Sequence, residues 1–194
     1  MRTGLQQNWQ KPQRFKTHES LNRMKVFLDT NMLFSAVHSD GLCRELLYWP
    51  TDTAEENDNP YALPPKISIE YVISDRVIAE LSCIFVTKLK YSAVKTAALI
   101  SHIVTMIPLV PASETTVPCP DETDGWILAD AHLAGCEYFV TGDRIVLSLY
   151  SVQGMRIISP RELMDFLFTG KTIPKFEAHE DRADYLVTRL KSIA

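Results

Sequence analysis

The segment from Lys25 to Asn31 reads Lys-Val-Phe-Leu-Asp-Thr-Asn and is the clearest structural signal in the chain. Its apolar first half predicts a short buried strand over residues 25–28. Asp29 follows that strand directly, so an acidic side chain stands where the strand ends. The polar residues 29–31 are also suited to capping a helix, because their side chains accept hydrogen bonds from free backbone N–H groups. The segment therefore predicts a strand end, a helix start and a carboxylate at one place.

Outward from this segment, strand and helix patterns alternate along the chain. We expect the further strands at 67–73, 104–107, 138–140 and 156–158. We expect helices at 41–49, 74–88, 92–103, 124–134, 143–150, 159–168 and 181–191. Gly135 is placed to end one helix, and Ser159-Pro-Arg-Glu162 has the form of a capping box that starts another. Such alternation favours an α/β fold with a largely parallel sheet and helices on both faces, in which functional residues collect at the carboxyl ends of the strands.

Composition indicates a globular protein. Of 194 residues, 46% are hydrophobic and 23% charged, so the chain can bury a core and global disorder is excluded. The net charge of −4 lacks the basic excess that is typical of nucleic-acid binding. A site that collects carboxylates for a metal also lowers the net charge, however, so this argument against nucleic acid is weak.

The cysteines and the hydropathy pattern predict a cytoplasmic protein. Cys43, Cys83, Cys119 and Cys136 lie far apart without zinc-ligand spacing, which argues against a structural zinc site and favours reduced thiols. No apolar stretch reaches the ~20 residues that a membrane span needs, and the N-terminus lacks the apolar core of a signal peptide. We expect no membrane association.

Three regions follow from the pattern. Residues 1–23 are polar and somewhat basic and predict a mobile tail. Residues 24–169 carry the alternating elements and predict one domain, with a proline-rich insertion at 50–66. Residues 170–194 predict a C-terminal helical extension.

Four acidic residues are the candidate functional set: Asp29, Glu80, Asp124 and Asp143. The three aspartates lie near helix starts, where capping is the ordinary structural explanation. Glu80 lies about 40° beyond the apolar stripe of its helix, so we expect it to be half buried, which is costly without a partner. A basic partner would satisfy Glu80, and so would a metal ion.

Taken together, the four carboxylates predict a cation site. Several carboxylates at one sheet edge repel one another and stay ionised together only if cations neutralise them. Oxygen ligands favour Mg²⁺ or Mn²⁺ over zinc. Such a site can lower the pKa of bound water and stabilise the leaving oxygen of a phosphodiester.

Four segments in this order resemble PIN-domain nucleases, and among them the small prokaryotic proteins that include VapC-like toxins. These segments are Lys25–Asn31, Ser74–Leu81, Asp121–Ala129 and Tyr138–Asp143, and Gly154–Glu162 resembles the closing strand and helix of the family. The resemblance covers residues 24–168. The tail, the insertion and the extension depart from the compact toxins.

The resemblance implies an α/β/α sandwich around a central, mostly parallel five-stranded sheet. It implies Mg²⁺- or Mn²⁺-dependent endoribonuclease activity, with Asp29, Glu80, Asp124 and Asp143 as catalytic and metal-binding residues. Small polar or acidic positions of the family match the supporting residues Asn31, Asp121 and Thr141. Partners implied in the same way are an RNA substrate, an antitoxin protein if the chain is the toxin of a toxin–antitoxin pair, and a second copy in a homodimer.

Two other function classes remain open at this point. A non-catalytic PIN-like module would keep the fold and bind RNA or protein, although all four acidic positions are retained here. A phosphatase with an aspartate nucleophile also places Asp after its first strand, but Asp29-Thr30-Asn31 lacks the second Asp of the haloacid dehalogenase pattern. Asp130 points about 120° away from Asp124 on the same helix, so we expect it to face solvent or to form a salt bridge.

Overall fold

The computed structural model describes residues 23–48 and 68–169. The expected insertion at 50–66 and extension at 170–194 lie outside these ranges, as does the expected tail apart from Arg23. The description below therefore concerns the alternating α/β part of the chain. In that part, no helix is long and apolar enough to cross a membrane.

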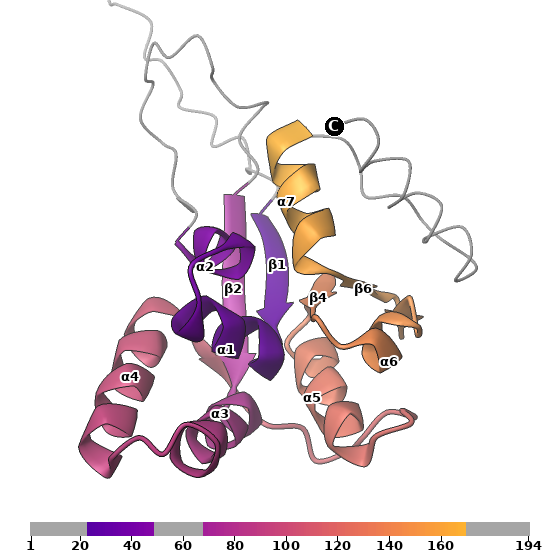
Figure 1. Ribbon diagram of the computed structural model, residues 1–194. Coiled ribbons are helices and arrows are strands. Elements are labelled where there is room, and N and C mark those ends of the chain that lie inside the picture. The colour runs from indigo at the N-terminus through magenta and orange to yellow at the C-terminus, as the bar shows by residue number, and fades with distance from the viewer. Residues whose placement is uncertain (1–22, 49–67, 170–194) are drawn as a thin grey trace, which may run out of the picture.

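A single sheet runs through the described part of the chain, with helices on both sides (Figure 1). Its spatial order is β3-β2-β1-β4-β6-β5. All neighbouring strands are parallel except β5 and β6, which form a short antiparallel pair. The strands are β1 (Arg23–Leu28), β2 (Ser68–Ser74), β3 (Leu109–Val110), β4 (Tyr138–Val140), β5 (Ser151–Val152) and β6 (Met155–Ile158).

Seven helices accompany these strands in the described ranges. In Figure 1, α1 and α2 lie over β1 and β2, while α4 lies at the outer side of α3. Contacts join α1 to α2, α2 to α7 and α3 to α4, and α5 packs on β2. The helices are α1 (Thr30–His38), α2 (Leu42–Leu47), α3 (Asp75–Thr87), α4 (Ala93–Met106), α5 (Glu122–Leu133), α6 (Arg144–Leu147) and α7 (Pro160–Thr169).

The centre of the sheet is strand β1, as its unbroken apolar run predicts. Val26, Phe27 and Leu28 are all fully buried, because β1 is paired on both edges and covered on both faces. Phe27 stacks on Phe139 of β4, with ring centroids 5.4 Å apart. This packing fixes β1 and β4 side by side, and with them the residues that follow the two strands.

The strand order reverses direction at β1. From β1 the chain moves to β2 and β3 on one side, and it later returns to β4 and β6 on the other side. In sheets of this kind the crevice outside the carboxyl ends, at the point of reversal, is where ligands bind. The residues that follow β1 and β4 lie at that point.

The expected α/β class and the parallel five-stranded sheet are confirmed, and β5 adds a two-residue antiparallel edge strand. The predicted strand at 104–107 is wrong. Helix α4 continues to Met106 because no helix breaker precedes Pro108, and the short strand β3 begins at Leu109 instead.

Two predicted helix boundaries are confirmed by their local geometry. Gly135 ends the α5 region with φ at +72°, a conformation that other residues adopt at a cost. At the start of α7, the Ser159 amide donates to Glu162 Oε2 at 2.7 Å, and the Glu162 amide donates to Ser159 Oγ at 3.2 Å. This reciprocal pair is the expected capping box.

Candidate functional site

Asp29 lies at the carboxyl end of β1, at the reversal point of the sheet. Its side chain is only 6% exposed, and its backbone N–H continues the sheet by donating to the Val140 carbonyl at 3.0 Å. The pKa of Asp29 is raised from its usual 3.8 to about 7, mainly by burial and to a smaller extent by the nearby carboxylates Asp124 and Glu80. Hydrogen bonds from Thr141 and Thr30 partly oppose this rise. Asp29 is therefore a buried carboxyl in a negative environment.

A polar network centred on Thr141 holds Asp29 in place. The Thr141 hydroxyl donates to Asp29 Oδ2 at 2.6 Å and is itself fully buried. The same oxygen accepts from Asn31 Nδ2 and from the Asp143 amide, each at 3.0 Å. Asn31 Oδ1 in turn accepts from the Gly142 amide at 2.8 Å. Thr141 therefore orients the Asp29 carboxylate, and Asn31 and Thr141 together join the end of β1 to the end of β4.

Glu80 is half buried on α3 and has a partner that the sequence did not suggest. The Thr30 hydroxyl donates to Glu80 Oε2 at 2.6 Å. Thr30 follows Asp29 and begins α1, and its backbone N–H donates to Asp29 Oδ1 at 2.7 Å. One threonine therefore contacts two of the four predicted carboxylates, one through its amide and the other through its hydroxyl.

Asp124 lies in the first turn of α5 and is the least compensated carboxylate of the set. The pKa of Asp124 is raised to about 6, mainly by burial and to a smaller extent by Asp121, Asp143 and Glu80. No hydrogen bond to its carboxylate is found within residues 23–48 and 68–169. Its negative charge is therefore opposed by desolvation and by three neighbouring acidic residues.

Asp143 and Asp121 both cap helices, as the ordinary structural explanation predicts. Asp143 Oδ1 accepts from the Ile145 amide at 2.7 Å at the start of α6. Asp121 Oδ1 accepts from the Thr123 amide at 2.7 Å at the start of α5. Both nevertheless raise the pKa of Asp124, so both lie close enough to add to its negative environment. Each has one carboxylate oxygen beyond the capping contact.

The donor set fits a hard divalent cation in its chemistry. It consists of carboxylate, hydroxyl and amide oxygens, and two of its carboxyls, Asp29 and Asp124, have raised pKa values that a cation would lower. As they stand, no three His, Cys, Asp or Glu side chains of the described ranges are arranged to hold a metal ion. The carboxylates are gathered at one edge but do not already enclose a cation.

Two features of the site escaped the sequence interpretation. The sequence predicts a capping role for Thr30, whereas its hydroxyl also donates to Glu80 on another helix, a contact that no local pattern indicates. Asp130 is fully buried and paired with Arg76, so the salt-bridge expectation is confirmed and the solvent-facing alternative is wrong.

Comparison with known proteins finds likeness at the level of structure and none at the level of sequence. No protein-family model and no curated protein matches the sequence. Among solved structures, a VapBC2 complex from Rickettsia felis, bound to a DNA fragment from its promoter, matches with a TM-score of 0.48 at 13% identity. The match covers 70% of this chain and 98% of that chain. A likeness this distant leaves the chemistry to be argued from the residues of the chain itself.

Proposed function

We propose that the protein is a metal-dependent endoribonuclease, which hydrolyses RNA phosphodiesters at the acidic edge of its sheet. The observation that carries the proposal is the burial of Asp29 and Asp124 beside other carboxylates. Both carboxyls are desolvated and lie among other carboxylates, which raises their pKa values to about 7 and about 6. Such an arrangement is unfavourable for an isolated fold and becomes favourable when a cation is bound.

In this proposal Asp29, Asp124, Asp143 and Glu80 are the Mg²⁺ or Mn²⁺ ligands, directly or through water. A divalent cation at such a site supplies an activated water and charge stabilisation for the leaving oxygen of a phosphodiester. Thr141 and Thr30 hold the Asp29 carboxylate through bonds to its two oxygens, which leaves little freedom for rotation. Thr30 also fixes Glu80, so these two acidic groups keep a constant relation.

Asn31 and Asp121 have supporting roles in the proposed site. Asn31 bridges Thr141 and Gly142, and so keeps the turn after β4 against the start of α1. Asp121 adds negative charge beside Asp124 and has an exposed side chain, which suits it to an outer position in the site. Neither is proposed to react with the substrate.

The test is cleavage of a mixed panel of structured and single-stranded RNAs by the full chain, with Mn²⁺, Mg²⁺ or EDTA. Wild type should cleave only with a metal, and Asp29→Asn should lose most of this activity while remaining folded. Cleavage by Asp29→Asn at the wild-type rate would contradict the ligand assignment. A folded wild type that neither binds metal nor cleaves any RNA would favour the non-catalytic binding module instead.

A narrower form of the proposal is that the protein is the toxin of a toxin–antitoxin pair and forms a homodimer. Its support is the motif resemblance between residues 24 and 168. The decisive experiment is expression of wild type and Asp29→Asn in a bacterial host. Growth arrest by wild type alone, relieved by a protein encoded beside it, would support the toxin assignment, and normal growth with wild type would oppose it. Sedimentation of the purified chain would decide between monomer and dimer.

A further inference from the structure

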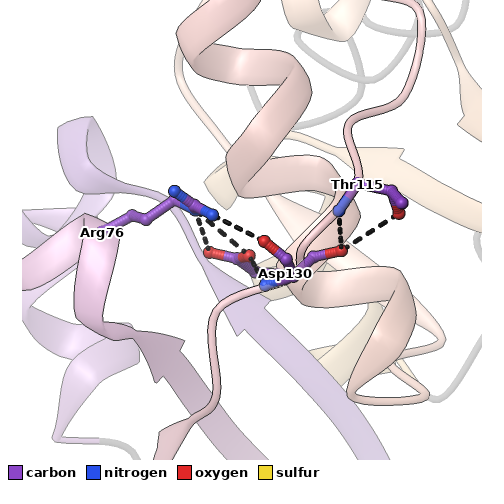
Figure 2. Close-up of polar contacts among 4 residues, drawn as sticks. Arg76, Thr115 and Asp130 are labelled. Carbon is purple, nitrogen blue, oxygen red and sulfur yellow. Dashed lines mark hydrogen bonds and ion pairs between the residues drawn. The ribbon is translucent and has the colours of Figure 1, made fainter.

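An ion pair with a fully buried carboxylate joins the two helices that carry Glu80 and Asp124. Figure 2 shows Arg76 extending from α3 toward Asp130 on α5. Arg76 Nε lies 3.4 Å from each of the two Asp130 carboxylate oxygens. Asp130 is completely buried, whereas the Arg76 side chain keeps 34% exposure. The pair thus reaches from the surface of α3 into the core beneath α5.

The same carboxylate also fixes the loop that leads into α5. The Ser113 amide donates to Asp130 Oδ1 at 2.6 Å, and the Ser113 carbonyl accepts from Arg76 Nη2 at 2.6 Å. The Thr115 amide donates to Ser113 Oγ at 3.1 Å, which tightens the loop at this point (Figure 2). Three segments therefore meet at one carboxylate: α3, the loop after β3 and α5.

Each of the three segments carries a residue of the acidic edge. Arg76 lies four residues before Glu80, and therefore on the same face of α3. Asp130 lies six residues after Asp124 on α5, and the loop fixed by Ser113 ends in Asp121. The Arg76 guanidinium also lies 4.7 Å from the Trp126 ring centroid, which adds a second contact between α3 and α5.

The tie between α3 and α5 sets how far apart Glu80 and Asp124 lie, because each of these carboxylates is carried by one of the two tied helices. A buried ion pair is a poor device for stability alone, since an apolar pair of similar volume often serves equally well. It can fix one relative position, because Asp130 Oδ1 accepts from both the Ser113 amide and Arg76 Nε, and each donor has to lie in a defined direction.

We propose that Arg76 and Asp130 are positioning residues, which hold α3 and α5 at the separation where Glu80 and Asp124 can share a divalent cation. The inference rests on the proposed metal site. Neither residue contacts the cation or the RNA. Their effect is on how readily the two carboxylates come together around the metal.

The experiment measures Mn²⁺ binding to full-length variants by isothermal titration calorimetry, at a temperature where circular dichroism shows each to be folded. Asp130→Asn keeps an oxygen for the Ser113 amide and removes only the charge opposite Arg76. Arg76→Gln breaks the ion pair at its more exposed residue, so this variant replaces Asp130→Asn in the experiment if Asp130→Asn does not fold. Asp40→Asn is the matched control, because Asp40 pairs with Arg44 beyond the far end of α1.

We expect Asp130→Asn and Arg76→Gln each to weaken Mn²⁺ affinity by about tenfold or more, as loss of residues behind metal ligands does elsewhere. The double variant should bind Mn²⁺ with about the same affinity as the single variant of lower affinity, because Arg76 and Asp130 act as one unit. Asp40→Asn should bind Mn²⁺ as wild type does.

If the folded variants bind Mn²⁺ with wild-type affinity, even at a lowered melting temperature, the ion pair only stabilises the fold. That result would overturn the positioning role and leave the proposed nuclease activity standing. If wild type binds Mn²⁺ but cleaves no RNA, the proposed nuclease activity is overturned. The positioning role then still stands if the two variants bind Mn²⁺ more weakly than wild type. Wild type that binds no Mn²⁺ would overturn both.

Discussion

Replacing Asp29 by Asn should stabilise the metal-free protein at pH 8, although it removes a carboxylate that accepts two hydrogen bonds. One pKa unit corresponds to about 1.36 kcal/mol. Raising the pKa of Asp29 from 3.8 to about 7 therefore makes its ionised form about 4 kcal/mol less favourable in the folded than in the unfolded state. Asn carries no charge and avoids this cost.

The substitution also loses one hydrogen bond. Asn keeps an oxygen for the Thr30 amide, but its NH₂ group then faces the Thr141 hydroxyl. That hydroxyl already accepts from Asn31 and from the Asp143 amide, so it cannot accept a third bond. A buried donor left without an acceptor costs about 1–3 kcal/mol. The net gain at pH 8 is about 1–3 kcal/mol, or several degrees in melting temperature.

The sign of the pH dependence follows from the raised pKa. Between pH 3.8 and about 7 the folded state binds more protons at Asp29 than the unfolded state, so wild-type stability falls as pH rises through this window. At pH 5 the penalty is only about 1.6 kcal/mol, which the lost hydrogen bond offsets. The advantage of Asp29→Asn should therefore vanish or reverse at pH 5.

The assay is thermal and urea unfolding of wild type, Asp29→Asn and the control Asp40→Asn in EDTA, at pH 5 and pH 8. Excess Mn²⁺ should then reverse the order at pH 8, because a ligand at about 1,000 times its dissociation constant adds about 4.1 kcal/mol to the protein that binds it. The reasoning is refuted if Asp29→Asn is no more stable than wild type at pH 8 in EDTA. It is also refuted if the difference is the same at both pH values.

Three further predictions concern the surroundings of Asp29 and Asp124. Mn²⁺ affinity should rise with pH between about 5 and 8, because Asp29 and Asp124 must lose protons to bind, and calorimetry in two buffers should detect the released protons. Thr141→Val should lower the free energy of unfolding by about 1–3 kcal/mol and reduce RNA cleavage, since it removes the hydroxyl that holds Asp29. If Thr141→Val cleaves RNA at the wild-type rate, the hydrogen bonds of Thr141 are not needed for activity. Gly125→Ala should lower the free energy of unfolding by about 1–3 kcal/mol, and with it the melting temperature, because the added Cβ would lie 2.6 Å from the Val117 carbonyl oxygen. An unchanged melting temperature would show that the loop around Val117 moves aside without cost.

The parts of the fold that were predicted are those in which local pattern and packing agree. The apolar run of Val26, Phe27 and Leu28 marks the centre of the sheet, and Gly135 marks a helix end by its positive φ. The strand expected at 104–107 failed because β-branched and aliphatic residues are equally suited to the last turn of a helix that is buried on one side. There Ile103 and Ile107 face the core from α4 and its cap.

The candidate site was predictable as far as it depends on strand ends. Asp29 and Asp143 follow neighbouring strands, so parallel topology alone brings them to one edge. The contact between Thr30 and Glu80 depends on how α3 is inclined against α1, and the pair of Arg76 and Asp130 depends on how α3 meets α5. These are tertiary relations between residues about 50 positions apart, which a local pattern does not encode.

The central claim is that the carboxylates at this edge hold a catalytic divalent cation, and the most direct test is to locate the cation. Crystals of the full chain grown with Mn²⁺ should give an anomalous difference peak at the manganese edge. The account predicts a peak within about 2.5 Å of carboxylate oxygens from Asp29 and Asp124, absent in Asp29→Asn. A peak elsewhere on the molecule, or the same peak in Asp29→Asn, would contradict it.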